Sequence, residues 1–192
     1  VVNLNAANTW TGNANVTDSN NTFVGFESGY TNNGGNNNTF MGFQSGYANT
    51  TGYSNLFLGY QTGYKNTTGY QNTFVGNGAG YSNTDSNGNN FIGYAAGYYN
   101  TTGDYNTFQG NSAGYSNTEG NNNSFFGRGS GRGNTTGNNN TYIGFGAGFN
   151  NSTGNGNVFL GFQAGLNETG SNKLYIDNSS TSTPLIAGDF AA

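Results

Sequence analysis

The segment 21–37 reads NTFVGFESGYTNNGGNN, and it returns at once as NTFMGFQSGYANTTGYS from Asn38. Seven further copies follow without insertion or deletion, each starting 17 residues after the one before, at Asn55, Asn72, Asn89, Asn106, Asn123, Asn140 and Asn157. The alternation in NTFVGF is typical of a strand, and two glycines per unit oppose a helix. A short period without insertions is what stacked coils require. We therefore expect an all-β chain folded as a parallel β-solenoid (β-roll) of 17-residue coils.

Several positions of the repeat do not vary, and each predicts a column of residues along the rod; we name each column by its first member. The Asn21 column is always Asn, the Phe23 column is always aromatic, and the Gly25 and Gly29 columns are always Gly. The Asn32 column is Asn until it ends at Glu168. At about 4.8 Å between coils, like charges would repel, whereas Asn amides donate to one neighbour and accept from the other. This predicts asparagine ladders and explains why only 6% of the residues are charged.

The two ends depart from the repeat. Residues 1–20 are interpreted as a degenerate coil or cap in which Trp10 covers the core, and residues 21–173 as nine repeats. Residues 174–192 contain a predicted strand, 174–176, then a Ser/Thr-rich turn, Pro184 and a short apolar tail. We interpret them as a C-terminal cap or a linker to a further domain.

Composition argues against several functions. The chain has no His and no Cys, so the usual general base, thiolate and soft metal ligands are missing, and we expect no enzyme activity and no cofactor or metal. The carboxylates Glu27, Asp104 and Glu119 lie in different repeats, which assembles no acid/base pair. Four basic residues are too few to neutralise a run of phosphates, so nucleic acid is not an expected partner. No apolar run reaches the roughly 20 residues of a membrane span, so membrane insertion of this segment is not expected either.

Two faces of the predicted strand are apolar, although one coil can enclose only one of them. The Phe23 column is expected inside, so the Val24 and Phe26 columns are left on the outside. Such a stripe exceeds the exposed patch that monomers tolerate, which predicts a subunit interface. The predicted interface residues are Val24, Phe26, Met41, Phe43, Leu58, Tyr60, Val75, Ile92, Tyr94, Ile143, Phe145, Leu160 and Phe162.

The unit N-T-F-V-G-F-x-S-G-Y resembles the S-x-A-I-G-x-x-A-x-A repeats in the heads of trimeric autotransporter adhesins. It is more similar to the NTxxGxxAGYxNTTGxxN repeats of bacterial surface proteins and phage tail fibres, which often precede an intramolecular chaperone domain of the endosialidase type. The resemblance implies a homotrimer, intertwined or side by side, that is extracellular on a cell or virion surface. Its partners would be itself and a host-surface glycan or protein. The repeat is longer than that of the adhesin heads, and we recognise no coiled-coil stalk, anchor or chaperone pattern of that family within these 192 residues.

Arg128 and Arg132 are the unusual residues, because both replace aromatic residues within one repeat. One interpretation is that they stack on Tyr115 or Phe149. The other is an anion or glycan contact shared with Asn111. If the Phe26 column faces a threefold axis, three Arg128 side chains would converge there and would require a counter-ion.

Three weaker patterns have ordinary alternatives. The Thr50 column (Thr50, Thr67, Thr84, Thr101, Thr118, Thr135, Ser152 and Thr169) suits turns, although regular Thr arrays can also bind ice. Sequons start at Asn49, Asn66, Asn100 and Asn134, and DSNGNN from Asp85 resembles a calcium loop with too few carboxylates. The sequence thus predicts a structural or adhesive fibre segment, with an ice-binding or glycan-binding module as the alternative.

Overall fold

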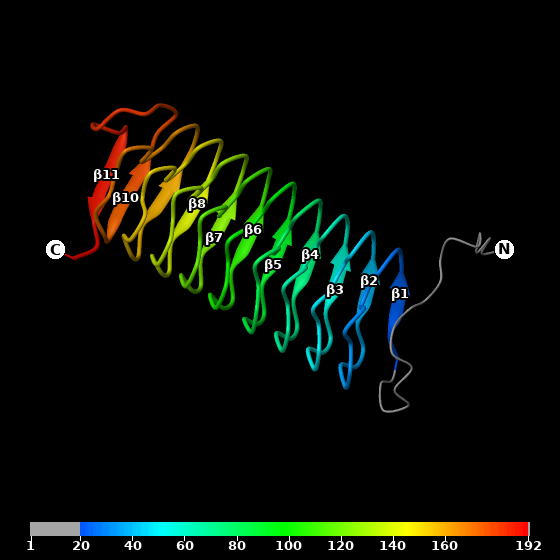
Figure 1. Cartoon of the computed structure of the whole chain (residues 1–192). Helices are drawn as coiled ribbons and strands as arrows, with labels where there is room; N and C mark the ends of the chain where they lie inside the picture. The colour runs from blue at the N-terminus through cyan, green and yellow to red at the C-terminus, as the bar shows by residue number, and fades with distance from the viewer. Residues whose placement is uncertain (1–19, 192) are drawn as a thin grey trace.

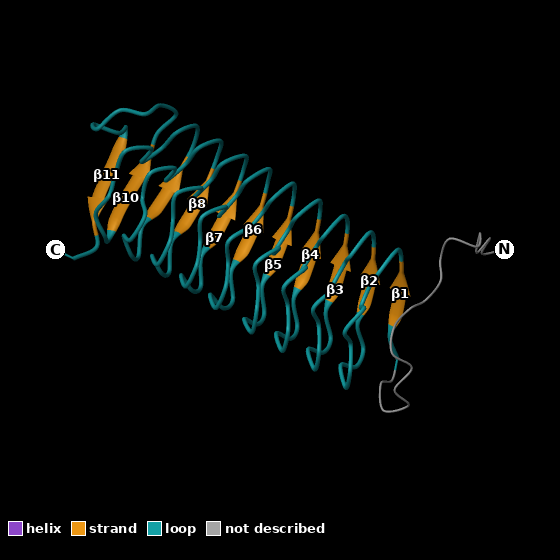
Figure 2. Cartoon of the chain, viewed as in Figure 1, coloured by secondary structure: helices purple, strands orange, loops and turns teal. Residues whose placement is uncertain are grey.

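The computed structural model describes residues 20–191, which form a rod of stacked coils from β1 at one end to β11 at the other (Figure 1). The described residues contain strands and turns and no helix (Figure 2). Nine three-residue strands, one per coil, are β1 Thr22–Val24, β2 Thr39–Met41, β3 Leu56–Leu58, β4 Thr73–Val75, β5 Asn90–Ile92, β6 Thr107–Gln109, β7 Ser124–Phe126, β8 Thr141–Ile143 and β9 Val158–Leu160. Two strands close the rod, β10 Lys173–Ile176 and β11 Ile186–Asp189.

The strands lie side by side in chain order, and β1 to β10 are all parallel. From β1 to β9 each strand residue pairs with the residue 17 positions further on, as Phe23 does with Phe40. The prediction of an all-β parallel solenoid of nine coils with a 17-residue repeat is confirmed. The degenerate coil predicted for residues 1–20, including Trp10, lies almost entirely outside the described residues.

The Phe23 column forms the core. The rings from Phe40 to Phe159 have no exposed surface, and successive rings stack with centroids 4.7–4.9 Å apart. Small residues such as Ala96 and Ala147 complete the interior from the opposite side of the coil. The prediction that this column faces inward is confirmed. The coil spacing also suits the offset stacking of aromatic rings.

The two glycine columns are invariant for two different steric reasons. A Cβ on Gly93, whose φ is 138°, would lie 2.5 Å from the carbonyl oxygen of Gly110 in the next coil. A Cβ on Gly97 would lie 2.4 Å from the ring of Phe91. Both glycines also have a positive φ, which L side chains adopt only with strain. The first glycine therefore lets the coils approach, and the second makes room for the core ring.

Two buried asparagine ladders run along the rod, as predicted. In the Asn32 column, Asn49 Nδ2 donates to Asn32 Oδ1 at 2.6 Å and to the Gly52 carbonyl at 3.1 Å. In the Asn21 column, the Oδ1 of Asn21 accepts the backbone N–H of Asn38 at 2.8 Å. The same contacts recur from coil to coil, so the buried amides pair with one another and with the turn backbone until the Asn32 column reaches Asn134, whose Oδ1 accepts no hydrogen bond among the described residues.

The C-terminal end differs from the prediction in two details. Leu174 pairs with Val158, which is 16 residues away, so the ninth coil is one residue shorter than the interpretation of residues 21–173 assumed. The strand predicted at 174–176 is β10, which starts at Lys173. The apolar tail contributes β11, which pairs antiparallel with β10 and brings Asp189 within 2.6 Å of Lys173.

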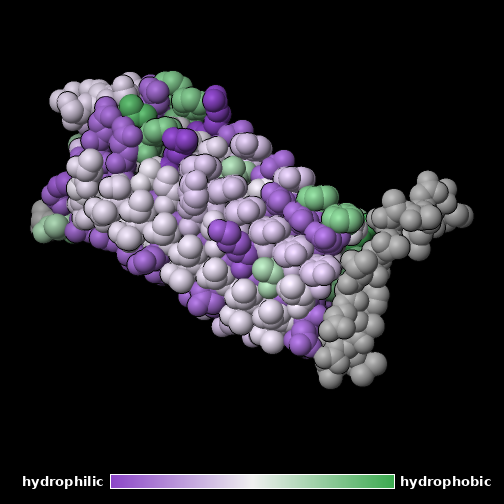
Figure 3. All heavy atoms as spheres, viewed as in Figure 1, coloured by the Kyte–Doolittle hydropathy of each residue, from purple (hydrophilic) through white to green (hydrophobic). Residues whose placement is uncertain are grey.

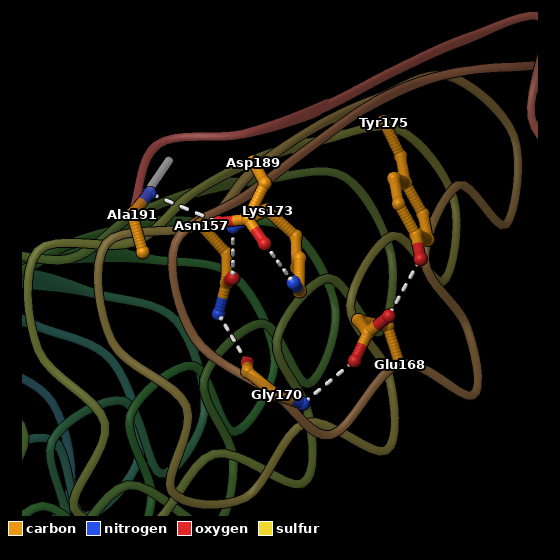
Figure 4. Close-up of polar contacts among 7 residues, drawn as sticks. All are labelled: Asn157, Glu168, Gly170, Lys173, Tyr175, Asp189 and Ala191. Atoms are coloured by element: carbon orange, nitrogen blue, oxygen red, sulfur yellow. Dashed lines mark hydrogen bonds and ion pairs between the residues drawn. The ribbon is translucent and has the colours of Figure 1, made fainter.

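Glu168 ends the Asn32 column with a carboxylate in place of the amide. Its Oε1 accepts the Gly170 N–H at 2.7 Å, and its Oε2 accepts the Tyr175 hydroxyl at 2.6 Å (Figure 4). Partial burial of Glu168 favours the neutral acid, but these hydrogen bonds outweigh it and lower the pKa of Glu168 overall. The carboxylate therefore ties the shortened coil to the strand that covers it.

Candidate functional site

The predicted interface residues all lie on the outer surface of the rod, half-exposed or exposed. Exposure is 38% for Ile92 and 59% for Tyr94, for example. The Phe26 column carries two stacked groups, Phe26–Phe43–Tyr60 near β1 and Phe145–Phe162 near β9. Between these groups it is interrupted by Asn77, Asn111 and Arg128.

A second aromatic column, which the sequence interpretation did not single out, follows the Gly29 column. Tyr30, Tyr47, Tyr64, Tyr81, Tyr98 and Tyr115 stack with centroids 4.9–5.5 Å apart. The signal in the sequence was the aromatic residue directly after the second glycine of most repeats. We call this the Tyr30 column; it continues through Arg132, Phe149 and Leu166.

Both arginines stack on aromatic rings, Arg132 on the two rings that one interpretation named and Arg128 on a different ring. The Arg132 guanidinium carbon lies 5.1 Å from the centroid of the Tyr115 ring and 5.5 Å from that of Phe149. Arg132 therefore takes the place of a ring within the Tyr30 column. Arg128 lies in the Phe26 column with its guanidinium 5.5 Å from the centroid of the Phe145 ring. The rings hold both cations while leaving their side chains exposed.

A groove of about 530 Å³ lies between these two columns, over the sixth to ninth coils. Its aromatic and basic lining consists of Arg128, Arg132, Phe145 and Phe149. Its polar lining consists of Asn111, Ser112, Asn150 and Gln163. Gly129 and Gly146 also line it, and neither contributes a side chain of its own. The three residues predicted as a ligand contact, Arg128, Arg132 and Asn111, thus border one groove.

The groove exists because one column changes size along the rod. This Glu27 column holds Glu27, Gln44 and Gln61 in the first three coils, and their side chains form a hydrogen-bonded row. The eighth coil has Gly146 at the equivalent position, and the seventh has Gly129. The loss of these side chains opens the space between the Phe26 and Tyr30 columns.

Charge is one-sided in this groove. Two of the chain's four basic residues line it, and no described carboxylate does. Among residues 20–191 the ion pair within 4 Å is Lys173–Asp189, between β10 and β11 at the C-terminal end of the rod, so neither arginine is paired with a described carboxylate. On a chain of net charge −4 this makes a local basic site.

The weaker candidate patterns have structural explanations. The Thr50 hydroxyl donates to the carbonyl of Thr67 at 3.0 Å, and the same contact repeats along that column. These hydroxyls therefore join the turns of neighbouring coils rather than bonding within one turn. The sequon residues Asn49, Asn66, Asn100 and Asn134 have no exposed surface, so these four side chains are not accessible to glycosylation in the folded rod. No group of three His, Cys, Asp or Glu side chains occurs in the described part, at Asp85 or elsewhere.

Comparisons with protein-family models, curated proteins and solved structures give no match. Within residues 20–191 no helix is long and apolar enough to cross a membrane. Figure 3 shows one face of the rod, where hydrophobic side chains gather near both ends and are few and separate between them.

Proposed function

We propose that this chain is a non-catalytic structural or adhesive segment of an extracellular fibre, which assembles with copies of itself on a bacterial cell or phage surface. The observation that carries the proposal is the outer stripe formed by the Val24 and Phe26 columns. The stripe runs along the rod from β1 to β9, and its apolar side chains are half-exposed or exposed.

The construction of the rod supports a mechanical role. Each coil bonds to the next through its strand, its turn carbonyls and two amide ladders. A one-dimensional stack of this kind is elongated and stiff, and a fibre segment requires both properties. The carboxylates Glu27, Asp85, Asp104 and Glu119 lie in different coils, and among the described residues no group of three His, Cys, Asp or Glu side chains supports an enzymatic alternative.

Self-association is the part of the proposal that an experiment can test most directly. The sixth coil interrupts the stripe with Gln109 and Asn111, but the apolar side chains of the other coils would remain in water in a single rod, and burying them between copies is favourable. Three copies around one axis, intertwined or side by side, would cover the Val24 column, and the resemblance of the repeats favours that number.

The test replaces Leu58 and Ile92 of the Val24 column with Asp. Buried unpaired carboxylates should dissociate the assembly while leaving each coil folded, because both side chains point away from the core. Thr68→Asp is the matched control, since Asp85 and Glu119 already occupy the equivalent exposed position. Light scattering should give a trimer for the unchanged chain and the control, and a monomer for the double variant. A monomeric unchanged chain at micromolar concentration would contradict the proposal.

The alternative module functions differ in their support. Ice binding by the Thr50 column loses support because those hydroxyls already donate to backbone carbonyls. A thermal-hysteresis measurement tests it directly. Ligand binding is favoured by the basic groove, which is developed next.

A further inference from the structure

We propose that the groove over the sixth to ninth coils binds an acidic saccharide, with Arg132 and Arg128 as the residues that recognise its carboxylate. This deepens the adhesive role proposed above by assigning a ligand class to one site. The Phe26 column borders both the groove and the self-association stripe. The Glu27 and Tyr30 columns form the remainder of the groove.

The arginines supply a prepared anion site. Arg132 lies between the rings of Tyr115 and Phe149, so its guanidinium is already ordered before a ligand arrives. A guanidinium fork binds a carboxylate through two parallel hydrogen bonds, and prior ordering reduces the entropy lost on binding. No described carboxylate competes for either arginine. Charge complementarity therefore selects an anionic ligand.

The rest of the lining favours a sugar over a simple anion. Phe145 and Phe149 offer apolar ring surface, while Asn111, Asn150 and Gln163 offer amide donors and acceptors. A pyranose ring presents the matching combination of apolar C–H groups and hydroxyls. The volume of about 530 Å³ falls in the range of small-molecule sites, about 300–1,000 Å³. Three steps of about 4.8 Å between four coils give the groove the length of a short oligosaccharide.

The site is local, which argues that it is more than a general property of the rod. In the first three coils the row of Glu27, Gln44 and Gln61 fills the equivalent space and adds a carboxylate. Lys65, another exposed cation, lies 5.5 Å from the centroid of the Tyr81 ring but outside the groove. Aromatic stacking of a cation thus occurs at two places, and only one of them combines two arginines with an open space.

The experiment is calorimetric titration of the full chain with trigalacturonate and with 3′-sialyllactose, beside maltotriose and lactose as neutral counterparts and inorganic phosphate as a simple anion. We expect one of the acidic saccharides to bind more tightly than its neutral counterpart and than phosphate. Arg132→Gln and Arg128→Gln should each weaken that binding by about tenfold or more, because each removes a charge-assisted bond. Lys65→Gln is the matched control and should leave it unchanged.

A steric variant tests the groove separately from its charge. A Cβ on Gly146 would lie 3.5 Å from Leu166 Cδ1 and 3.6 Å from Gln163 Cγ, which are ordinary contacts. Gln already occupies this column with a positive φ at Gln44, Gln61 and Gln163, so Gly146→Gln should fold. It should fill the space and abolish saccharide binding without removing a charge, and its melting temperature reports that the rod is intact.

Several results would overturn the site. They are no binding of either acidic saccharide, equal binding of the neutral sugars or of phosphate, and equal weakening by Lys65→Gln and Arg132→Gln. Light scattering on the same samples reports self-association independently. A chain that assembles without binding saccharide contradicts only the groove, and a monomer that binds saccharide contradicts only the fibre assembly.

Discussion

Tyr142 is the one member of the Phe23 column that carries a hydroxyl. Its ring stacks between Phe125 and Phe159, with both centroids 4.8 Å away, and it has no exposed surface. The hydroxyl has no hydrogen-bond partner among the described residues, and burial raises the pKa of Tyr142. A contact with the Asn157 side-chain amide partly offsets the effect of burial on this pKa, but the amide directs an N–H to the Gly170 carbonyl at 2.9 Å and makes no hydrogen bond of good geometry to the hydroxyl.

Tyr142→Phe should therefore stabilise the rod. An unpaired buried polar group costs about 1–3 kcal/mol, and the space left by one oxygen atom forfeits only a small part of that gain. A net gain of about 1–2 kcal/mol corresponds to a rise in Tm of about 2–8 °C for a chain of this length. Thermal unfolding followed by circular dichroism, at one protein concentration because assembly also raises Tm, measures it.

The matched control is Phe74→Tyr, which places a hydroxyl in the same column four coils from Tyr142 and should lower Tm by a similar amount. A fall in Tm for Tyr142→Phe would refute the reasoning, since it would mean that the hydroxyl makes a stabilising bond.

Three further predictions concern the ladders, the turns and the C-terminal end. Asn66→Ala removes the 2.7 Å hydrogen bonds that Asn66 donates to Asn49 and accepts from Asn83, and it leaves buried amide groups unpaired. The free energy of unfolding, measured in urea, should fall by about 3 kcal/mol or more. A fall below about 1 kcal/mol would contradict the ladder's stabilising role. Gln71 is exposed and has a φ of 57°, so Gln71→Gly should relieve backbone strain and raise the free energy of unfolding by about 0.5–1 kcal/mol. A decrease would show that the Gln71 side chain stabilises the turn. The pKa of Glu168 is lowered in the folded chain, so the stabilisation by its carboxylate is complete above about pH 4.5 and is lost as pH falls through the folded pKa. The Tm of Glu168→Gln should therefore fall less in acid than the Tm of the unchanged chain. An equal fall would show that Glu168 does not contribute to the acid dependence.

Features that recur in every repeat could be predicted from the sequence. The inward Phe23 column and the Asn32 ladder follow from one requirement, which is that each coil present the same groups to its neighbours. The turn role of the Thr50 column was also predicted. The hydrogen bonds from its hydroxyls to the next coil were not, because the sequence of one repeat shows only the residues of its own turn.

Features that depend on departures from the repeat were harder to predict. The missing residue before β10 and the antiparallel strand β11 lie where the period ends. The groove depends on side chains that are absent, at Gly129 and Gly146, between columns whose proximity follows only from the path of the turn. Arg128 and Arg132 were recognisable as unusual, yet the sequence gives no distance between the Phe26 and Tyr30 columns.

The constant separation of 17 residues between paired strands also bears on how the rod folds. Parallel sheets usually join segments that are distant in the chain, and loop closure makes them slow to form. Here most neighbours are one coil away, and 17 divided by 192 gives a relative contact order of about 0.09, in the range of helical bundles. Each new coil can therefore add to a finished one soon after it is synthesised, so the chain should fold progressively along its length.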